Sequence, residues 1–294
     1  MSREEDETRE LLERMKHELG RRPEPDAEAP QQPAGPVYNP GTPPPQRVRL
    51  SLPLSQPRAV YVLLVINVVM YGLTQLLAVS LRGSDRLVLG DPFSLALLQL
   101  GAKWGPAIEA GQYWRFLTPI VLHGGVVHLA FNSYALYALG PDAERFFGTG
   151  RFLAIYLLAG FAGTLASYIR SPGLSIGASG AIFGLIGALA AFFYRARSLI
   201  GAEASRQQVT QLVTMAAINL VLGLTVPTID NAAHIGGMIA GAAAGYVLAP
   251  GYAVDDRLYP PVVVRTDRSA IAWPAAAAIL VSLIAMAAVA VGQR

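Results

Sequence analysis

The chain has 294 residues, of which 53% are hydrophobic and 15% charged, and it contains no cysteine. Soluble globular domains carry about 25% charged residues, so the composition excludes an ordinary soluble domain, and the lack of cysteine excludes disulfides, thiolate metal sites and cysteine nucleophiles. The net charge of +3 comes from Lys and Arg scattered between apolar runs. We interpret them as membrane-flanking charges and expect no nucleic-acid partner.

The first 58 residues are predicted to lie outside the folded core. Residues 1–22 are mostly charged, with leucines and a methionine at helical spacing, which predicts a charged cytoplasmic helix or tail. This segment is compatible with a partner-binding helix, a helix on the membrane or a solvated tail. Residues 23–58 are so rich in proline that we expect a disordered linker.

From residue 59 the chain becomes a series of apolar segments. A bilayer core takes about 20 helical residues, and these segments reach or approach that length. They are separated by loops that hold nearly all of the charge, which predicts an all-α polytopic membrane protein folded as a compact bundle. The segments are 59–80, 117–139, 151–170, 178–195, 209–225, 232–249 and 271–291.

The positions of Lys and Arg predict the orientation of these spans. If the N-terminus is cytoplasmic, the loop 251–270 is cytoplasmic, the connection 225–231 lies outside without a positive charge, and the C-terminus is outside. We expect a bacterial plasma membrane, because the acidic tail is unlike a transit peptide. The arginines then inside are Arg47, Arg49, Arg58, Arg145, Arg151, Arg195, Arg197, Arg206, Arg257, Arg265 and Arg268.

Polar residues from three spans converge at the outer side of the predicted bundle. His128 and Asn132 are four residues apart and share one face of the second span, Ser179 opens the fourth, and His234 lies one turn into the sixth. Ionisable residues inside membrane spans are costly and are functional candidates by default. The three spans therefore predict one site.

Ser179 is in a good position for a nucleophile, because unpaired amides at a helix start stabilise an oxyanion. A serine needs a base, and His234 is the candidate. Gly180 and Gly184 on one helix, and Gly237 and Gly241 on the other, predict two closely packed helices that run in the same direction. That packing would bring Ser179 and His234 together.

Each of these residues also has a structural interpretation. GxxxG patterns are typical of helix packing, a membrane serine often bonds a backbone carbonyl, and Asn132 can join two helices. Asp230 precedes His234 by four residues and can be a triad acid, but we favour an N-cap there and a Ser–His dyad. His123 and His128 would point roughly 140° apart on one helix, so no metal site is predicted.

Four motifs in chain order resemble the rhomboid family of intramembrane serine proteases, over about residues 59–250. They are Trp114-Arg115 in the first outer loop, His128-x-x-x-Asn132, Gly177-x-Ser179-Gly180, and Ala233-His234-x-x-Gly237-x-x-x-Gly241.

The resemblance implies a serine endopeptidase that hydrolyses peptide bonds in or near transmembrane helices. Ser179 would be the nucleophile and His234 the general base and acid, and the side chains of His128 and Asn132 would join the Ser179 amide in the oxyanion hole. The supporting residues would be Gly177, which keeps the approach open, Gly180, and Phe183, which stacks on the imidazole. Glu144 and Gly148 match a structural element of the family.

The resemblance further implies a rhomboid-like six-helix core, residues 59–250, plus one extra C-terminal transmembrane helix in residues 271–294. The partners would be the lipid bilayer and transmembrane-helix substrates. The substrates would enter by a gate at the fifth helix and the loop 225–231. No metal or organic cofactor is implied, because water is the second substrate. No sequence feature indicates an oligomeric state.

Two alternatives from other functional classes remain. A non-catalytic rhomboid-like protein that binds membrane helices is disfavoured because both Ser179 and His234 are present. A small transporter with a midplane polar site is disfavoured because no inverted repeat is evident.

Overall fold

The computed structural model of the chain describes residues 13–14, 54–82, 91–255, 257, 262–266 and 268–294. The chain divides into two units, Met1–Val48 and Arg49–Arg294. In the first unit only Glu13 and Arg14 are described, and both are helical and exposed. Apart from these two residues, the predicted tail of residues 1–22 therefore lies outside the described residues, and so does the proline-rich segment 23–58 except for residues 54–58.

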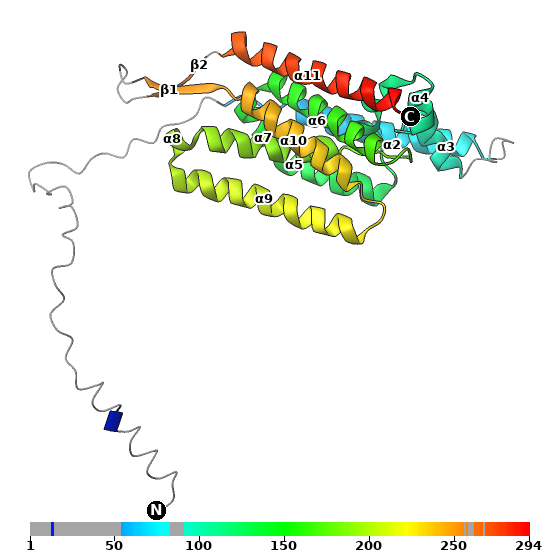
Figure 1. Cartoon of the computed structure of the whole chain (residues 1–294), viewed down its shortest axis with the longest axis horizontal. Coiled ribbons are helices and arrows are strands. Elements are labelled where there is room, and N and C mark those ends of the chain that lie inside the picture. The colour runs from blue at the N-terminus through cyan, green and yellow to red at the C-terminus, as the bar shows by residue number, and fades with distance from the viewer. Residues whose placement is uncertain (1–12, 15–53, 83–90, 256, 258–261, 267) are drawn as a thin grey trace, which may run out of the picture. The chain divides into compact units, whose positions relative to one another are not determined.

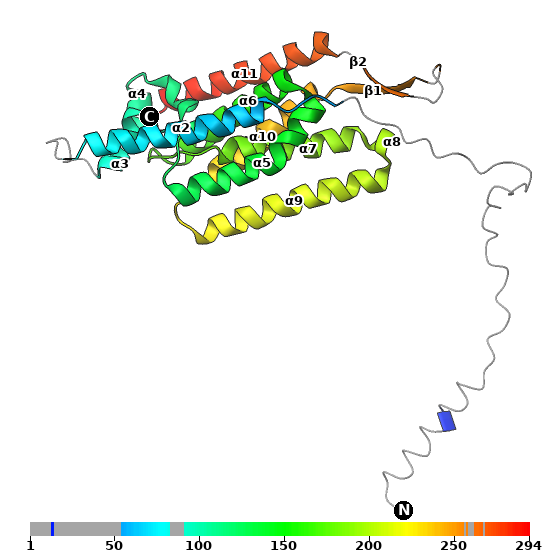
Figure 2. The ribbon, with the colours of Figure 1, turned by 180° about the vertical axis from the view of Figure 1, so that it is seen from behind.

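The second unit is mainly helical, and its long helices run side by side with α9 at one edge and α11 at the other (Figure 1; Figure 2). Its elements are α2 (Ala59–Ser80), α3 (Pro92–Gln99), α4 (Gly105–Glu109), the 3₁₀ turns η2 (Tyr113–Phe116) and η3 (Thr118–Val121), α5 (Val126–Phe147), α6 (Thr149–Arg170), α7 (Ser179–Arg195), α8 (Arg197–Ile200), α9 (Ala202–Thr225), α10 (Asn231–Leu248), β1 (Gly251–Asp255), β2 (Val262–Thr266) and α11 (Ser269–Gly292).

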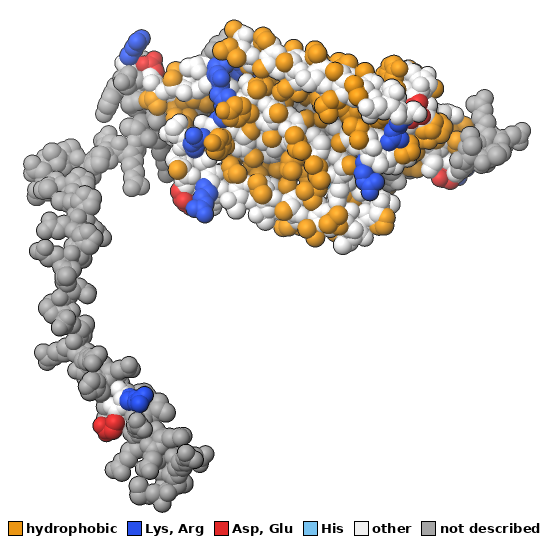
Figure 3. Space-filling model, in the orientation of Figure 1, with side chains coloured by type: hydrophobic (Ala, Val, Ile, Leu, Met, Phe, Trp, Pro, Cys, Tyr) orange, Lys and Arg blue, Asp and Glu red, His pale blue; other side chains and the backbone are white. Residues whose placement is uncertain are grey.

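Four of these helices, α2, α6, α9 and α11, are long and apolar enough to cross a membrane. Large apolar side chains of α2, α5, α9 and α11 are exposed, and on the face drawn in Figure 3 an apolar band separates charged side chains at the two ends. Such a surface is unfavourable in water and suits contact with lipid. The helix α7, with 17 residues, is a shorter apolar helix.

The centre of the bundle is the packing of α10 against α7 and α6. A Cβ atom added to Gly237 would overlap the carbonyl oxygen of Gly180, and one added to Gly241 would overlap that of Gly184. The backbones of α7 and α10 are therefore in direct contact. The prediction that these two glycine faces meet is confirmed.

The predicted bounds of the second span, 117–139, are wrong. The chain instead forms the turns η2 and η3, and α5 begins only at Val126, after the extended N-cap Gly125. At its other end α5 continues to Phe147 through Glu144, whose carboxylate is buried. Helix continuation is possible there because this carboxylate accepts hydrogen bonds from the amides of Ala59 and Val60 and from the Thr149 hydroxyl.

Two further differences lie toward the C-terminus. The fifth segment was predicted at 209–225, whereas α9 starts at Ala202, because its polar first turns are helical as well. The segment 251–270, expected as a loop, contains an antiparallel hairpin in which Gly251 pairs with Thr266 and Asp255 with Val262. The β-branched residues of β2 favour a strand.

The contact between α7 and α10 predicts the effect of added methyl groups. Gly241→Ala should lower the thermal unfolding midpoint of the detergent-purified protein, at a cost of about 1–3 kcal/mol, because the methyl group has no space beside Gly184. The control is Gly72→Ala on the exposed face of α2, where no atom lies within 4 Å of an added Cβ; it should leave the midpoint unchanged or slightly raised. A stable Gly241→Ala variant would contradict the packing.

Candidate active site

Ser179 and His234 meet at the starts of two neighbouring helices. Ser179 is the first residue of α7 and His234 lies in the first turn of α10. The Nε2 atom of His234 is 2.9 Å from the Oγ atom of Ser179. Ser179 is half-buried and His234 is buried, so the hydrogen-bonded pair lies in a largely dehydrated environment.

The imidazole of His234 is held by stacking. The ring of Phe183, one turn after Ser179 on α7, lies parallel to it, with ring centroids 4.2 Å apart and an interplanar angle of 7°. The expected aromatic contact is confirmed. The other ring nitrogen, Nδ1, has no hydrogen-bond partner among the described residues, so no carboxylate completes a triad in the described structure.

Asp230 is the N-cap of α10, as expected. Its carboxylate accepts a 3.0 Å bond from the Ala233 amide and further bonds from the hydroxyls of Ser175 and Ser167. Burial raises the pKa of Asp230, but these hydrogen bonds and the charge of Lys103 together lower it below its ordinary value. The carboxylate therefore stays ionised and ties the start of α10 to α6 and to the loop before α7.

Lys103 completes this polar network, and sequence reasoning missed it. Its side chain is buried, and its ammonium donates to the Ser171 carbonyl at 2.9 Å, while its backbone pairs with that of Ser175. Burial lowers the pKa of Lys103 to about 8, against the attraction of Asp230. The available signal was its rarity, since Lys16 in the tail is the only other lysine of the chain.

His128 and Asn132 flank the loop before Ser179. Gly177 has φ +123°, and a Cβ there would lie 2.8 Å from Nε2 of His128 and 3.8 Å from Nδ2 of Asn132. The Gly124 amide donates to Nδ1 of His128 at 3.3 Å, which assigns the proton of the neutral ring to Nε2. Nε2 of His128 and Nδ2 of Asn132, two N–H donors, thus lie beside the backbone of Gly177. A side chain at position 177 would block the space in front of them.

His123 is not part of the helix that carries His128, so the helical-angle argument against a metal rested on a wrong segment. His123 lies before α5, fully buried, and its ring packs edge-to-face on His128 at 5.3 Å between centroids. Neither of its ring nitrogens has a hydrogen-bond partner among the described residues.

Trp114 and Arg115 differ in their surroundings. Trp114 is exposed, whereas the buried guanidinium of Arg115 donates to the carbonyls of Leu98 and Ala102 and to the Gln112 side chain. Arg115 thereby holds the first long loop together and does not contact the Ser179–His234 pair.

Comparison with known proteins identifies the family. A model of the rhomboid domain matches residues 110–251. The chain is 45% identical over 176 residues to the rhomboid protease GluP of Bacillus subtilis, covering 59% of this chain and 34% of that protein. It is 31% identical over 255 residues to RHOMBOID-like protein 5 of Arabidopsis thaliana, covering 78% and 82%. The chain belongs to the rhomboid family.

The rhomboid domain contains all the candidate site residues, while α11 lies beyond the matched range. A third rhomboid relative, the putative rhomboid protease YdcA of Bacillus subtilis, is 36% identical over 136 residues, covering 46% of this chain and 66% of that protein. The match to GluP covers about a third of that rhomboid's length. As a rhomboid with four long apolar helices, the chain is a mostly helical integral membrane protein.

The network around Asp230 predicts a large effect on stability. Asp230→Ala should cost about 2–4 kcal/mol of unfolding free energy, because it removes a cap, the carboxylate that accepts from two serine hydroxyls, and the countercharge of buried Lys103. The control is Asp91→Ala, which removes an exposed N-cap from α3 and should cost about 1 kcal/mol. Equal losses in thermal unfolding would show that the buried network contributes nothing extra.

Proposed function

We propose that this chain is an intramembrane serine endopeptidase that cleaves peptide bonds in or near transmembrane helices through a Ser179–His234 dyad. The observation that carries the proposal is the 2.9 Å contact between the Ser179 hydroxyl and Nε2 of His234 at two helix starts. Membership of the rhomboid family supports it, since two of the relatives are named as proteases or putative proteases.

The proposed chemistry has two halves. His234 takes the hydroxyl proton as Ser179 Oγ attacks the carbonyl carbon, and then gives that proton to the leaving amine as the C–N bond breaks. In the second half His234 takes a proton from water, and the water oxygen attacks the carbonyl carbon of the acyl-enzyme. The ester C–Oγ bond then breaks, His234 gives the proton to Ser179 Oγ, and the new carboxyl end is released. The Phe183 stack keeps the imidazole plane fixed through both halves.

The developing oxyanion needs donors that are in place before the reaction. We assign this role to the side chains of His128 and Asn132 and to the Ser179 amide, which has no partner within its own helix. The positions of Nε2 of His128 and Nδ2 of Asn132 beside Gly177 support the assignment. Gly180 supports the site in a different way, by allowing α10 to approach.

We further propose the membrane arrangement. A six-helix core in residues 59–250 and an extra span in 271–294 would cross a bacterial plasma membrane, with residues 1–22, the linker 23–58 and the loop 251–270 in the cytoplasm and the C-terminus outside. The arginines at the hairpin end of the bundle support this orientation. The substrates would be membrane proteins with a transmembrane helix.

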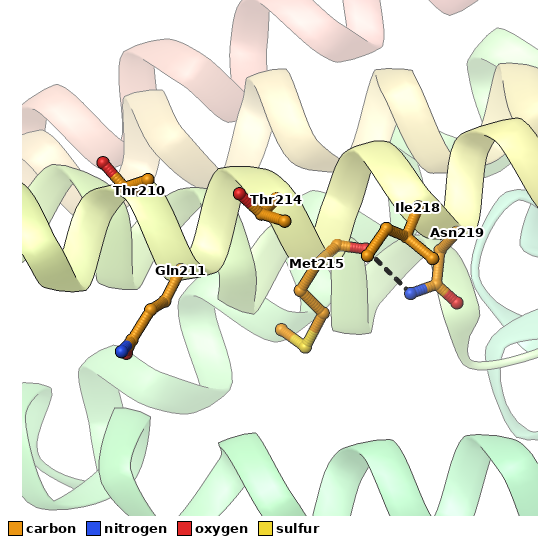
Figure 4. Close-up of a pocket in the computed structure, with 6 residues that line it drawn as sticks. All are labelled: Thr210, Gln211, Thr214, Met215, Ile218 and Asn219. Carbon is orange, nitrogen blue, oxygen red and sulfur yellow. Dashed lines mark hydrogen bonds between the residues drawn. The ribbon is translucent and has the colours of Figure 1, made fainter.

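The proposed entry route is beside α9. Of its 24 residues only Ser205, Leu212 and Ala216 are buried, so moving it disrupts little packing. A cavity of about 370 Å³ runs along this helix, with hydroxyl and amide side chains among its lining (Figure 4). The lining residues are Thr210, Gln211, Thr214, Met215, Ile218 and Asn219.

The dyad can be tested by labelling and cleavage. Purified wild type should react with a fluorescent fluorophosphonate and cleave a generic transmembrane-helix substrate, whereas Ser179→Ala and His234→Ala should reduce both to background because nucleophile or base is lost. Asp230→Asn tests the triad alternative: asparagine keeps an oxygen that can cap the Ala233 amide, so the folded variant should retain at least a tenth of the activity if Asp230 is no triad acid.

Substantial cleavage by folded Ser179→Ala would overturn the assignment. A folded wild type that neither labels nor cleaves would favour a non-catalytic protein that binds membrane helices.

Loss of a single oxyanion donor should lower the cleavage rate less than loss of Ser179 or His234. His128→Ala and Asn132→Ala should each lower the cleavage rate by roughly 10²–10³, because each removes one donor to the transition state while leaving the dyad in place. Substrate binding should change much less than the rate. An effect mainly on KM would place these two side chains in substrate binding instead.

A further inference from the structure

A second cavity lies at the opposite end of α6 from the loops around Ser179. Its volume is about 420 Å³, and it opens where α6 and α11, two of the helices able to cross a membrane, both begin. It therefore stands at a membrane–water boundary. The described residues that line it include no acid; they are Phe147, Gly148, Thr149, Gly150, Arg151, Arg265, Thr266, Ser269 and Trp273.

Arg265 supplies positive charge to this cavity. Its Nη2 donates to the Phe147 carbonyl at 2.6 Å, and both terminal nitrogens lie 3.4 Å from where a Cβ on Gly148 would stand. It forms no ion pair with any residue that the structure describes. A guanidinium has five N–H donors, and the neutral Phe147 carbonyl does not compensate its charge. The remaining donors suit a phosphate oxygen.

The other walls fit an amphipathic ligand. The hydroxyl-bearing residues Thr266 and Ser269 line the polar side. Trp273 is 43% exposed beside the opening, as is usual for indole rings at head-group level. From there Leu280, Val281 and Ile284 leave an apolar face of α11 uncovered, along which acyl chains can lie.

The charge of this end of the bundle points to the same ligand. Arginines stand at the ends of α5 and α7, at the starts of α6 and α9, in α8 and in and after the hairpin, and the positive-inside rule assigns such an end to the cytoplasmic, anionic leaflet. They are Arg145, Arg151, Arg195, Arg197, Arg206, Arg257, Arg265 and Arg268. Described acids are fewer there, and one, Asp142, pairs with Arg145.

We propose that the cavity lined by Arg265, Thr266 and Trp273 is a phosphate site that holds the head group of an acidic phospholipid. The guanidinium binds the phosphate, the Thr266 hydroxyl binds a further head-group oxygen, and the acyl chains follow α11. Basic pockets between transmembrane helices on the cytoplasmic side bind anionic head groups in this way. The site depends on embedding in a membrane and is independent of the proposed proteolysis.

The test is a lipid titration of the full chain purified in a neutral detergent. Thermal unfolding midpoints are recorded with dioctanoyl phosphatidylglycerol, with dioctanoyl phosphatidylcholine and with inorganic phosphate. Phosphatidylglycerol should raise the midpoint saturably and phosphatidylcholine should not. Arg265→Gln should weaken the apparent Kd about tenfold or more, whereas Arg197→Gln, an equal change of charge on α8 outside the cavity, should keep the wild-type Kd.

Each shift is measured against the same variant without lipid, because Arg265→Gln also loses its bond to Phe147. If glutamine prevents folding, Arg265→Lys serves instead; an ammonium lacks the paired donors, so the Kd should weaken several-fold. An Arg265-dependent shift from inorganic phosphate alone would support the phosphate site with a free anion as its ligand. Equal responses to both lipids, an unchanged Kd in the Arg265 variant, or equal losses in both arginine variants would overturn the proposal.

Discussion

Direct backbone contact between α7 and α10 is the constraint on which the site depends. In a bilayer the lipid tails are as apolar as the side chains, so helices associate mainly through close packing. Here the carbonyl oxygens of Gly180 and Gly184 occupy the space that side chains at Gly237 and Gly241 would need. Because the contact begins one residue after Ser179 and three after His234, it sets the distance between those two side chains.

Hydrogen bonds to the charged side chains of Asp230 and Lys103 hold together the end of the bundle at which α7 and α10 begin. Asp230 fixes the start of α10, and Lys103 joins the first long loop to the loop before α7. Charged groups are costly in such a position unless their partners are preorganised. The glycines thus bring the two helices together, and the polar network prevents their starts from moving apart.

Features of the site could be predicted from sequence where a local pattern or a recognised motif marked them. The start of α7 at Ser179 and the Asp230 cap depend on neighbouring residues, and both were predicted. The glycine faces and the Phe183 stack join residues more than 50 positions apart, but the glycine spacing and the family resemblance predicted them. The bounds of α5 and the role of Lys103 were not predicted, because they depend on distant partners. Glu144 is tolerated within α5 only because amides 84 and 85 residues away donate to it.

The sparse packing of α9 means that this helix can move more easily than α7 and α10, which carry Ser179 and His234. α9 packs chiefly on α7, and a hydrogen bond from the Asn231 side chain to the Leu220 carbonyl joins its outer end to α10. Displacement of the rest of α9 would leave in place the contact between α7 and α10, which sets the position of His234. In the proposed protease a substrate would therefore pass a loosely held flank, while α7 and α10 alone set the alignment of Ser179 and His234.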